Sequence, residues 1–198
     1  MAFLLTRRAA LTALAGTALL SACTIADDGK NTSSAGTSSE GALSTVTQGK
    51  LTIATGEPAY SPWVEDNDPA SGKGFEAAVA YAVAGKLGFA NSDVVWVRTT
   101  FDAAVAPGAK DWDFNLQQFS ITEERKNAVD FSSPYYTSAQ AVVTLKSSPV
   151  ASATSIEALK GALLGAQTGT TSYKTLTEKV APTTTPAVFN SSQDTVQA

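Results

Sequence analysis

The chain has 198 residues, and its balance of 43% hydrophobic and 16% charged residues is typical of a globular protein rather than a disordered or fibrous one. The formal charge of −4 becomes −6 without residues 1–22, which carry two arginines and no acid and so leave 12 basic against 18 acidic residues, a balance that argues against a nucleic-acid partner. With one cysteine and no histidine, the chain cannot form an internal disulfide, a Cys/His zinc site, a Ser-His-Asp triad or a Cys-His dyad.

Residues 1–22 are typical of an export signal. Arg7 and Arg8 precede a mostly apolar run over residues 9–20, which is long enough for a signal sequence and too short to span a bilayer. The next residues, Leu20-Ser-Ala-Cys23, resemble the lipobox of bacterial lipoproteins, whose cysteine is lipidated after cleavage. The alternative is a chance cysteine behind an ordinary signal peptide. The arginine pair also fits part of a twin-arginine signal, so both Sec and Tat export are open, and either route leads outside the cytoplasm.

Residues 23–48 have the composition of a flexible linker. Serine, threonine, glycine and alanine dominate this stretch, and it has too few large apolar residues to offset the entropy lost on ordering. A random coil of this length reaches on the order of 25–30 Å. We expect it to tether a folded region to a lipid anchor at Cys23.

Residues 49–146 predict one α/β lobe. Residues 50–55 have strand composition, and a loop with glycine and prolines, residues 56–63, leaves the C-terminal end of that strand, where ligands of open α/β sheets bind. The next expected elements are a helix over residues 75–87 and a strand over residues 94–97, an order that implies parallel strands. The others are a helix over 101–105, a short strand that passes into a polar turn over 114–119, a helix that begins at Ser120 or Thr122, and a strand over 139–145.

Arg125 is the strongest candidate for a binding residue. Ser120-Ile-Thr-Glu123 has the spacing of a capping box, which places Arg125 in the first turn of a helix. A guanidinium offers two parallel donors to a carboxylate, and the free N–H groups of a helix start add to them, together contributing about 2–5 kcal/mol toward holding a small anion. The alternative is that Glu123 and Glu124 pair with Arg125 on a solvated helix face.

Residues 147–198 predict the beginning of a second lobe. The expected elements are a helix over 155–160, a strand over 162–167, a helix opened by Gly169-Thr-Thr171, a strand over 187–189 and a helix from Ser192. Pro182 prevents the helix after Thr171 from continuing. Two adjacent threonines at a helix start form either a second anion site or an ordinary N-cap.

The segment SITEERKNAVDFSSPYY, residues 120–136, is similar to the one that marks the polar-amino-acid family of bacterial ABC-transporter solute-binding proteins. The likeness extends over the first lobe through KLTIATGEPAYSPW, GKGFEAAVAYAVAGKLGF and VVWVRTTFDAAV. It implies a two-lobed periplasmic-binding-protein type II fold, with the first lobe nearly complete and the second partial. The lobes of such proteins close over a ligand, here by hinge motion near Lys146.

The resemblance also implies roles for individual residues. In the family the arginine clamps the α-carboxylate of a free amino acid, which gives that role to Arg125, with Ser120 beside it. Gly169, Thr170 and Thr171 would hold the same carboxylate from the second lobe.

Three residues match positions that surround the ligand in the family. Tyr60 and Phe101 correspond to aromatic walls, and Glu57 to an acid that contacts the ligand's side chain. The alternatives are core packing for the two aromatic residues and a solvated turn for Glu57.

The sequence departs from the family pattern at the floor of the expected pocket. Asn115, Gln117 and Gln118 stand where many members have small residues, so the floor is richer in amides, and Gln118 is a candidate ligand contact. Ala78 stands where the family has an acid two residues after Glu76, a change that we expect to affect helix packing.

The implied function is that of a monomeric, lipid-anchored extracytoplasmic binding protein, without metal or cofactor, that captures a free polar amino acid and delivers it to an ABC permease. The alternatives are a dehydratase or lyase on the same fold, for which Glu57 is the candidate catalytic carboxylate, and a non-binding truncated remnant. Family members continue beyond this point, so we expect a fragment in which residues 49–146 are better ordered than residues 147–198 and ligand affinity is weak or absent.

Overall fold

The computed structural model describes residues 43–198. The expected signal segment, Cys23 and most of the expected linker lie outside this part of the chain. The residues just before the first strand are attached to the fold, because Asp113 accepts the backbone N–H of Val46 at 2.8 Å and that of Thr52 at 2.7 Å. None of the helices in the described part is long and apolar enough to cross a membrane.

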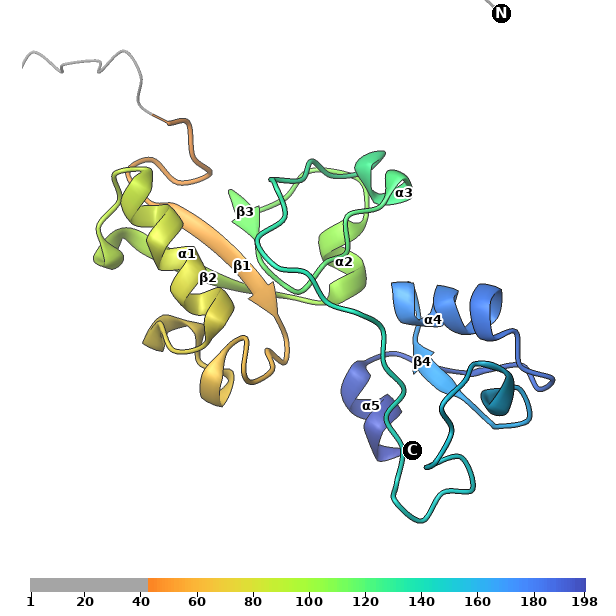
Figure 1. The fold of residues 1–198 in the computed structure, drawn as a ribbon. Helices are drawn as coiled ribbons and strands as arrows, with labels where there is room; N and C mark the ends of the chain where they lie inside the picture. Colours follow the sequence, from red (N-terminus) through yellow and green to blue (C-terminus); the bar gives the residue numbers. More distant parts are fainter. Residues whose placement is uncertain (1–42) are drawn as a thin grey trace, which may run out of the picture. The chain divides into compact units, whose positions relative to one another are not determined.

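The first lobe is built on a three-stranded parallel sheet in the order β2-β1-β3 (Figure 1). The strands are β1 (Leu51–Gly56), β2 (Val94–Thr99) and β3 (Phe114–Asn115). β1 pairs with β2 along its whole length and with β3 at two residues. Every residue of β1 is buried, as expected for the central strand of a parallel sheet covered on both faces. The predicted parallel arrangement is confirmed.

Helix α1 (Phe75–Lys86) packs against this sheet through its small residues. Ala80 and Ala84 are one helical turn apart on the same face, and both are fully buried against Leu51 and Ile53 of β1. The lobe also contains the short helices α2 (Phe101–Val105) and α3 (Glu123–Lys126) and the 3₁₀ turns η1 (Glu65–Asn67), η2 (Pro69–Ser71) and η3 (Asn91–Asp93).

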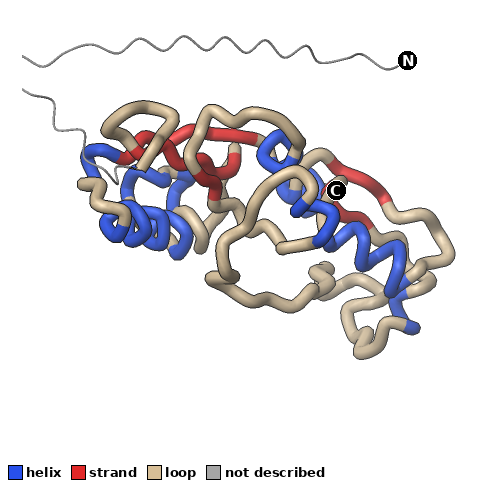
Figure 2. The backbone as a smooth tube through the Cα atoms, turned by 90° about the horizontal axis from the view of Figure 1, so that it is seen from above, coloured by secondary structure: helices blue, strands red, loops and turns tan. Residues whose placement is uncertain are grey.

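The second lobe has a two-stranded parallel sheet, β4 (Gly165–Gln167) and β5 (Ala187–Phe189) (Figure 2). Helix α4 (Thr171–Thr175) continues as a π-helical turn, η5 (Leu176–Val180), and α5 (Ser192–Gln197) follows β5; a 3₁₀ turn, η4 (Glu157–Leu159), precedes β4. Leu164, Ala166, Leu176 and Val180 form a small core. The helical stretch ends where Ala181 adopts a left-handed conformation, just before Pro182, as the sequence predicted.

The strand predicted over residues 139–145 is wrong. Residues 137–146, which we call the connecting segment, contain no helix or strand, and Val143 is 88% exposed. Strand propensity is realised only where a neighbouring strand supplies hydrogen bonds and packing, and the described residues supply none here.

Two further elements, the strand over 162–167 and the helix over 155–160, are shorter than predicted, and the strand is β4 (Gly165–Gln167). The short strand predicted to pass into a turn over 114–119 is β3, two residues long, and the chain turns at Gln118, which has a φ of 50°. The helix near Arg125 begins at Glu123 with Thr122, one of the two predicted starts, as its N-cap, because the Thr122 hydroxyl accepts the Arg125 N–H at 3.2 Å. The helix over 155–160 is a single 3₁₀ turn.

Candidate functional site

A cavity of about 390 Å³ lies at the junction of the two lobes. Its wall comes from the loops that follow β1, β2 and β3, from the connecting segment, and from the first turns of α4 and α5. Eight of the nine residues predicted from the sequence line it: Glu57, Tyr60, Phe101, Gln118, Ser120, Arg125, Thr170 and Thr171. The ninth, Gly169, lines an adjoining groove on the other side of Arg125. The fold therefore brings the predicted residues together, while their binding roles stay predictions.

Arg125 is held between the lobes by two backbone carbonyls. It is 8% exposed, and its guanidinium donates from Nη1 to the Ser120 carbonyl at 2.8 Å and from Nη2 to the Gly169 carbonyl at 2.9 Å. The same group lies 5.1 Å from the ring centroid of Phe101 and 6.0 Å from that of Phe119, both within cation–π range.

No carboxylate of the described residues lies within ion-pair distance of Arg125. The pairing considered from the sequence does not form, because Glu123 binds Lys126 at 2.6 Å. Burial lowers the pKa of Arg125, and the negative charges of Glu124 and Asp102 act in the opposite direction. A guanidinium stays protonated under these conditions, so Arg125 is a buried positive charge without a carboxylate partner among the described residues.

The threonines of the second lobe have two different roles. Thr170 is the N-cap of α4, since its hydroxyl accepts the Tyr173 N–H at 3.2 Å and donates to the Gln167 carbonyl at 2.7 Å. Thr171 reaches the first lobe instead, and its hydroxyl lies 3.1 Å from that of Ser120. The backbone N–H groups of the first turn have no partner within the helix. Donors from both lobes thus converge near Arg125.

Gln140, in the connecting segment, also lines the cavity, and it was not among the residues predicted from the sequence. Its amide nitrogen donates to the Thr171 hydroxyl at 3.2 Å, and its amide oxygen accepts the Ser172 hydroxyl at 2.8 Å. The sequence predicted a strand over residues 139–145, so Gln140 was interpreted as a residue paired within a sheet and not as a polar contact at the site.

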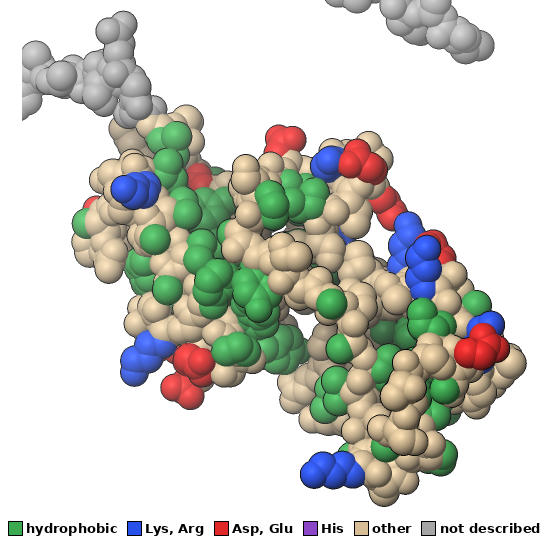
Figure 3. All heavy atoms as spheres, viewed as in Figure 1, with side chains coloured by type: hydrophobic (Ala, Val, Ile, Leu, Met, Phe, Trp, Pro, Cys, Tyr) green, Lys and Arg blue, Asp and Glu red, His purple; other side chains and the backbone are tan. Residues whose placement is uncertain are grey.

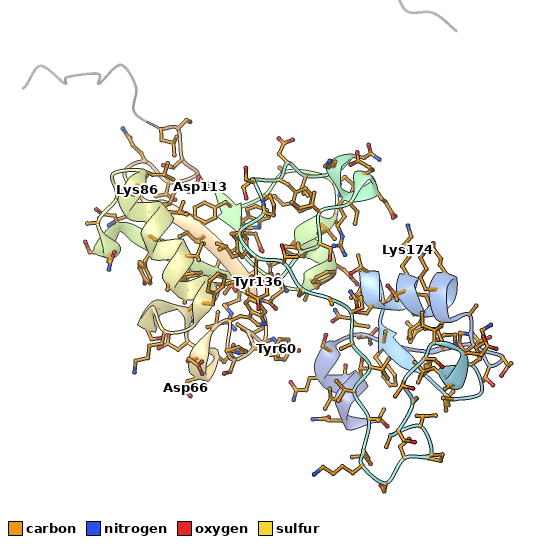
Figure 4. All side chains as sticks on the ribbon, viewed as in Figure 1. Tyr60, Asp66, Lys86, Asp113, Tyr136 and Lys174 are labelled. Atoms are coloured by element: carbon orange, nitrogen blue, oxygen red, sulfur yellow. The ribbon has the colours of Figure 1, made fainter. Side chains whose placement is uncertain are left out.

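The loop after β1 supplies Tyr60 and Glu57 (Figure 4). Tyr60 is half-buried at the cavity wall, and Phe101 packs against Phe119 with 4.7 Å between ring centroids. The Glu57 carboxylate lies 3.0 Å from Nε of Arg98, and its side chain is 54% exposed. Phe101 therefore packs against another ring and also lines the cavity. The negative charge of Glu57 is balanced by Arg98.

Glu76 is a further residue to which the sequence assigned no role at the site. It is 1% exposed, and its carboxylate accepts the Gln118 N–H at 2.8 Å, the Tyr135 hydroxyl at 2.6 Å and the Gln118 side-chain amide. Burial raises the pKa of Tyr135, and its hydrogen bond to Glu76 and the charge of that carboxylate raise it further. The acid after Phe75 was visible in the sequence, but its partners are set only by the fold.

Aromatic rings hold the residue just before the connecting segment on the first lobe. Tyr136 lies 4.9 Å from Trp63 and 5.5 Å from Phe75 between ring centroids, with edge-to-face geometry. Figure 3 shows hydrophobic side chains gathered on this face of the lobe, where Tyr136 is labelled in Figure 4. The chain that leads to the second lobe is thereby held against the first lobe.

This fold and this cavity are those of a small-molecule-binding protein with two α/β lobes. The chain belongs to the bacterial extracellular solute-binding proteins, family 3, whose family model matches residues 51–196. The two-lobed fold expected from the sequence is therefore confirmed. No group of acidic or cysteine side chains in the described part could hold a metal ion.

Relatives and solved structures with similar sequences are amino-acid-binding proteins. A probable histidine-binding protein of Campylobacter jejuni is 32% identical over 61% of this chain and 45% of its own length, and the histidine-binding periplasmic protein of Escherichia coli K12 is 27% identical over 71% and 52%. The chain thus spans about half the length of these curated relatives.

Two solved structures have a similar fold. An ancestral arginine-binding protein bound to arginine has a TM-score of 0.60 and 31% identity, covering 76% of this chain and 65% of its own. The ancestral amino acid-binding protein AncCDT-1, a precursor of cyclohexadienyl dehydratase, has a TM-score of 0.61 and 27% identity, covering 75% and 65%.

Proposed function

We propose that this chain provides the binding site of a lipid-anchored extracytoplasmic protein, which captures a free polar amino acid and delivers it to an ABC permease. The observation that carries the proposal is Arg125, a buried guanidinium held by carbonyls of both lobes and without a carboxylate partner among the described residues. A ligand carboxylate would supply the missing negative charge through charge-assisted hydrogen bonds.

The cavity has groups of opposite character for the two ends of an amino acid. Arg125 and the hydroxyls of Ser120 and Thr171 supply donors at one end. Glu57 supplies a carboxylate acceptor elsewhere on the wall. The names of the relatives, which bind histidine or arginine, support a ligand whose side chain carries N–H donors.

The anchor and the permease partner rest on the export signal and on the family. Cys23 lies outside the described residues, so its lipidation is inferred from Leu20-Ser-Ala-Cys23 alone. Exchange of Cys23 for serine should release the exported protein from the membrane fraction, and continued membrane association of the variant would contradict the anchor.

Replacement of the arginine tests the binding proposal. Arg125→Lys keeps the charge and loses the planar pair of donors, so affinity for L-histidine or L-arginine should fall about 10–100-fold, which corresponds to about 1–3 kcal/mol. Isothermal titration calorimetry measures this change. Lys126→Ala is the matched control, because Lys126 is an exposed neighbour that binds Glu123 outside the cavity. Equal affinities of the wild type and Arg125→Lys would remove Arg125 from the site.

A lyase or dehydratase is the second candidate, and the likeness to a dehydratase precursor is the observation that favours it. Such an enzyme needs a carboxylate whose proton affinity is tuned at the substrate. Glu57, the candidate, is more than half exposed and paired with Arg98, which supports binding over catalysis. Mass spectrometry of the bound compound distinguishes the two, since a binding protein returns its ligand unchanged and a lyase returns a product.

A further inference from the structure

Glu76 and Arg125 are the two charged residues that are buried in the described part of the chain. They have opposite charges, and neither forms an ion pair there. Arg125 lines the cavity, whereas Glu76 contacts it only through Gln118. A buried carboxylate without a cation is costly unless donors surround it, and three hydrogen bonds reach the carboxylate of Glu76.

Glu76 fixes the direction of the Gln118 side chain. An ionised carboxylate only accepts hydrogen bonds, so the group of Gln118 that meets it must be the amide NH₂. The Gln118 amide oxygen, which the structure does not hydrogen-bond to Glu76, is the end that remains for another partner. Glu76 also accepts the Gln118 backbone N–H, at the point where the chain turns with a φ of 50°. Both the backbone and the side chain of Gln118 are therefore set by one carboxylate.

We propose that Glu76 is a positioning residue that makes the floor of the cavity a hydrogen-bond acceptor for the ligand's ammonium group. Gln118 presents its amide oxygen, and the charge of Glu76 behind it strengthens the attraction for a cation. This assignment rests on the proposed function, because it supplies the ammonium counterpart of the carboxylate end at Arg125.

The test compares ligands with and without the ammonium group. The probes are L-arginine and L-histidine, together with 5-guanidinopentanoate and 3-(imidazol-4-yl)propanoate, which lack the α-amino group. Glu76→Gln keeps the size of the side chain but introduces an NH₂ that competes with that of Gln118. We expect affinity for the amino acids to fall about tenfold, as for one charge-assisted hydrogen bond, while affinity for the des-amino compounds stays the same.

Two other variants separate positioning from general structural damage. Tyr135→Phe removes a different donor from Glu76 and leaves Gln118 in place, so it should keep the wild-type ratio of the two affinities. Gln118→Met removes the acceptor and should lower the ratio as Glu76→Gln does. In one outcome, the wild type binds the amino acids while Glu76→Gln and Gln118→Met keep its ratio of amino-acid affinity to des-amino affinity. That result would overturn the assignment and leave the proposed function intact.

A measurement without ligand tests the same assignment independently of the affinity for any probe. In ¹H–¹⁵N spectra, a Gln118 amide proton bound to the carboxylate should lie downfield of its usual position, and Gln118→Met identifies the signal by its loss. Glu76→Gln should move this proton back toward the usual position. A Gln118 amide that does not respond to Glu76→Gln would show that Glu76 does not orient it, and would overturn the proposal.

Discussion

Tyr135 is the residue at which the buried charge of Glu76 should become visible in solution. The whole residue is 41% exposed, but its hydroxyl donates to a carboxylate that is 1% exposed, and the folded protein raises the pKa of Tyr135. The Tyr135 hydroxyl therefore contributes its full share of stability below about pH 10, the pKa of a tyrosine in the unfolded chain. This share is lost as the pH rises from there toward the higher pKa of Tyr135 in the folded protein.

Tyr135→Phe should remove this loss of stability at alkaline pH. At pH 7 the variant should be less stable by about 1 kcal/mol, the net value of one hydrogen bond, or somewhat more because the acceptor is charged. Above about pH 10 the difference between wild type and variant should narrow. Thermal unfolding from pH 7 to pH 11 measures both effects. A difference that stays constant across this range would contradict the coupling between Tyr135 and Glu76.

Gly169 lies where the backbone of the second lobe comes very close to a side chain of the first lobe. It has a φ of 67°, and a Cβ added there would lie 2.9 Å from Oδ1 of Asp102 in α2. Gly169→Ala should cost about 1–2 kcal/mol for the left-handed backbone, with a further loss from the crowded carboxylate. Because the Gly169 carbonyl accepts from Arg125, affinity for L-arginine should fall as well.

A double-mutant cycle separates the two parts of the Gly169 effect. Asp102→Ala in the Gly169→Ala background should recover the loss due to crowding and leave the backbone cost. Unfolding free energies and calorimetric affinities of the four proteins give the coupling. Additive effects of the two exchanges would mean that Asp102 and Gly169 are not in contact in solution.

At the scale of elements, the connecting segment has a specific link to α4 through Gln140. Gln140→Leu should remove two hydrogen bonds that hold Thr171 and Ser172, and so lower affinity for L-arginine about five- to tenfold, or by about 1–1.4 kcal/mol. It should also speed amide exchange over residues 169–175. Gln193→Leu is the control, because Gln193 is exposed in α5 and makes no side-chain hydrogen bond in the described part. Equal behaviour of the two variants would remove Gln140 from the site.

The elements that the sequence predicted well are those whose pattern is local. β1, α1 and α2 lie where apolar runs, helical spacing and the turn residues beside them indicated. The strand over 139–145 failed because a strand needs a partner, and the length of a run says nothing about whether a partner is present. The helix at Arg125 begins after Thr122, the later of the two starts that the sequence allowed, and it ends at Lys126.

The candidate site follows the same division between local and tertiary information. Arg125, Ser120 and Thr171 were found because their motifs are contiguous in sequence and resemble a known family. Gln140 and Glu76 were missed because their importance comes from partners far along the chain, 31 residues away in α4 for Gln140 and 42 residues away at Gln118 for Glu76. Such contacts leave no periodicity in the sequence.

At the scale of the whole molecule, the contacts near Arg125 join two lobes that each have a separate small core. The guanidinium reaches Gly169, and the Ser120 and Thr171 hydroxyls meet at 3.1 Å, so the groups expected to bind a carboxylate already contact one another. A ligand carboxylate would accept from donors of both lobes and strengthen the closed arrangement. The free energy of binding is then also free energy of lobe association.

Ligand binding should therefore protect both lobes together. With L-arginine or L-histidine at 100 times its dissociation constant, stability should rise by about 2.7 kcal/mol. Hydrogen–deuterium exchange should slow over residues 120–128 and 167–175, while the far side of the first lobe around residues 86–93 serves as an internal reference. The Arg125→Lys variant at the same ligand concentration should show weaker protection in both segments. Protection confined to one lobe would mean that the ligand does not bridge them, and that closure is not coupled to binding at Arg125.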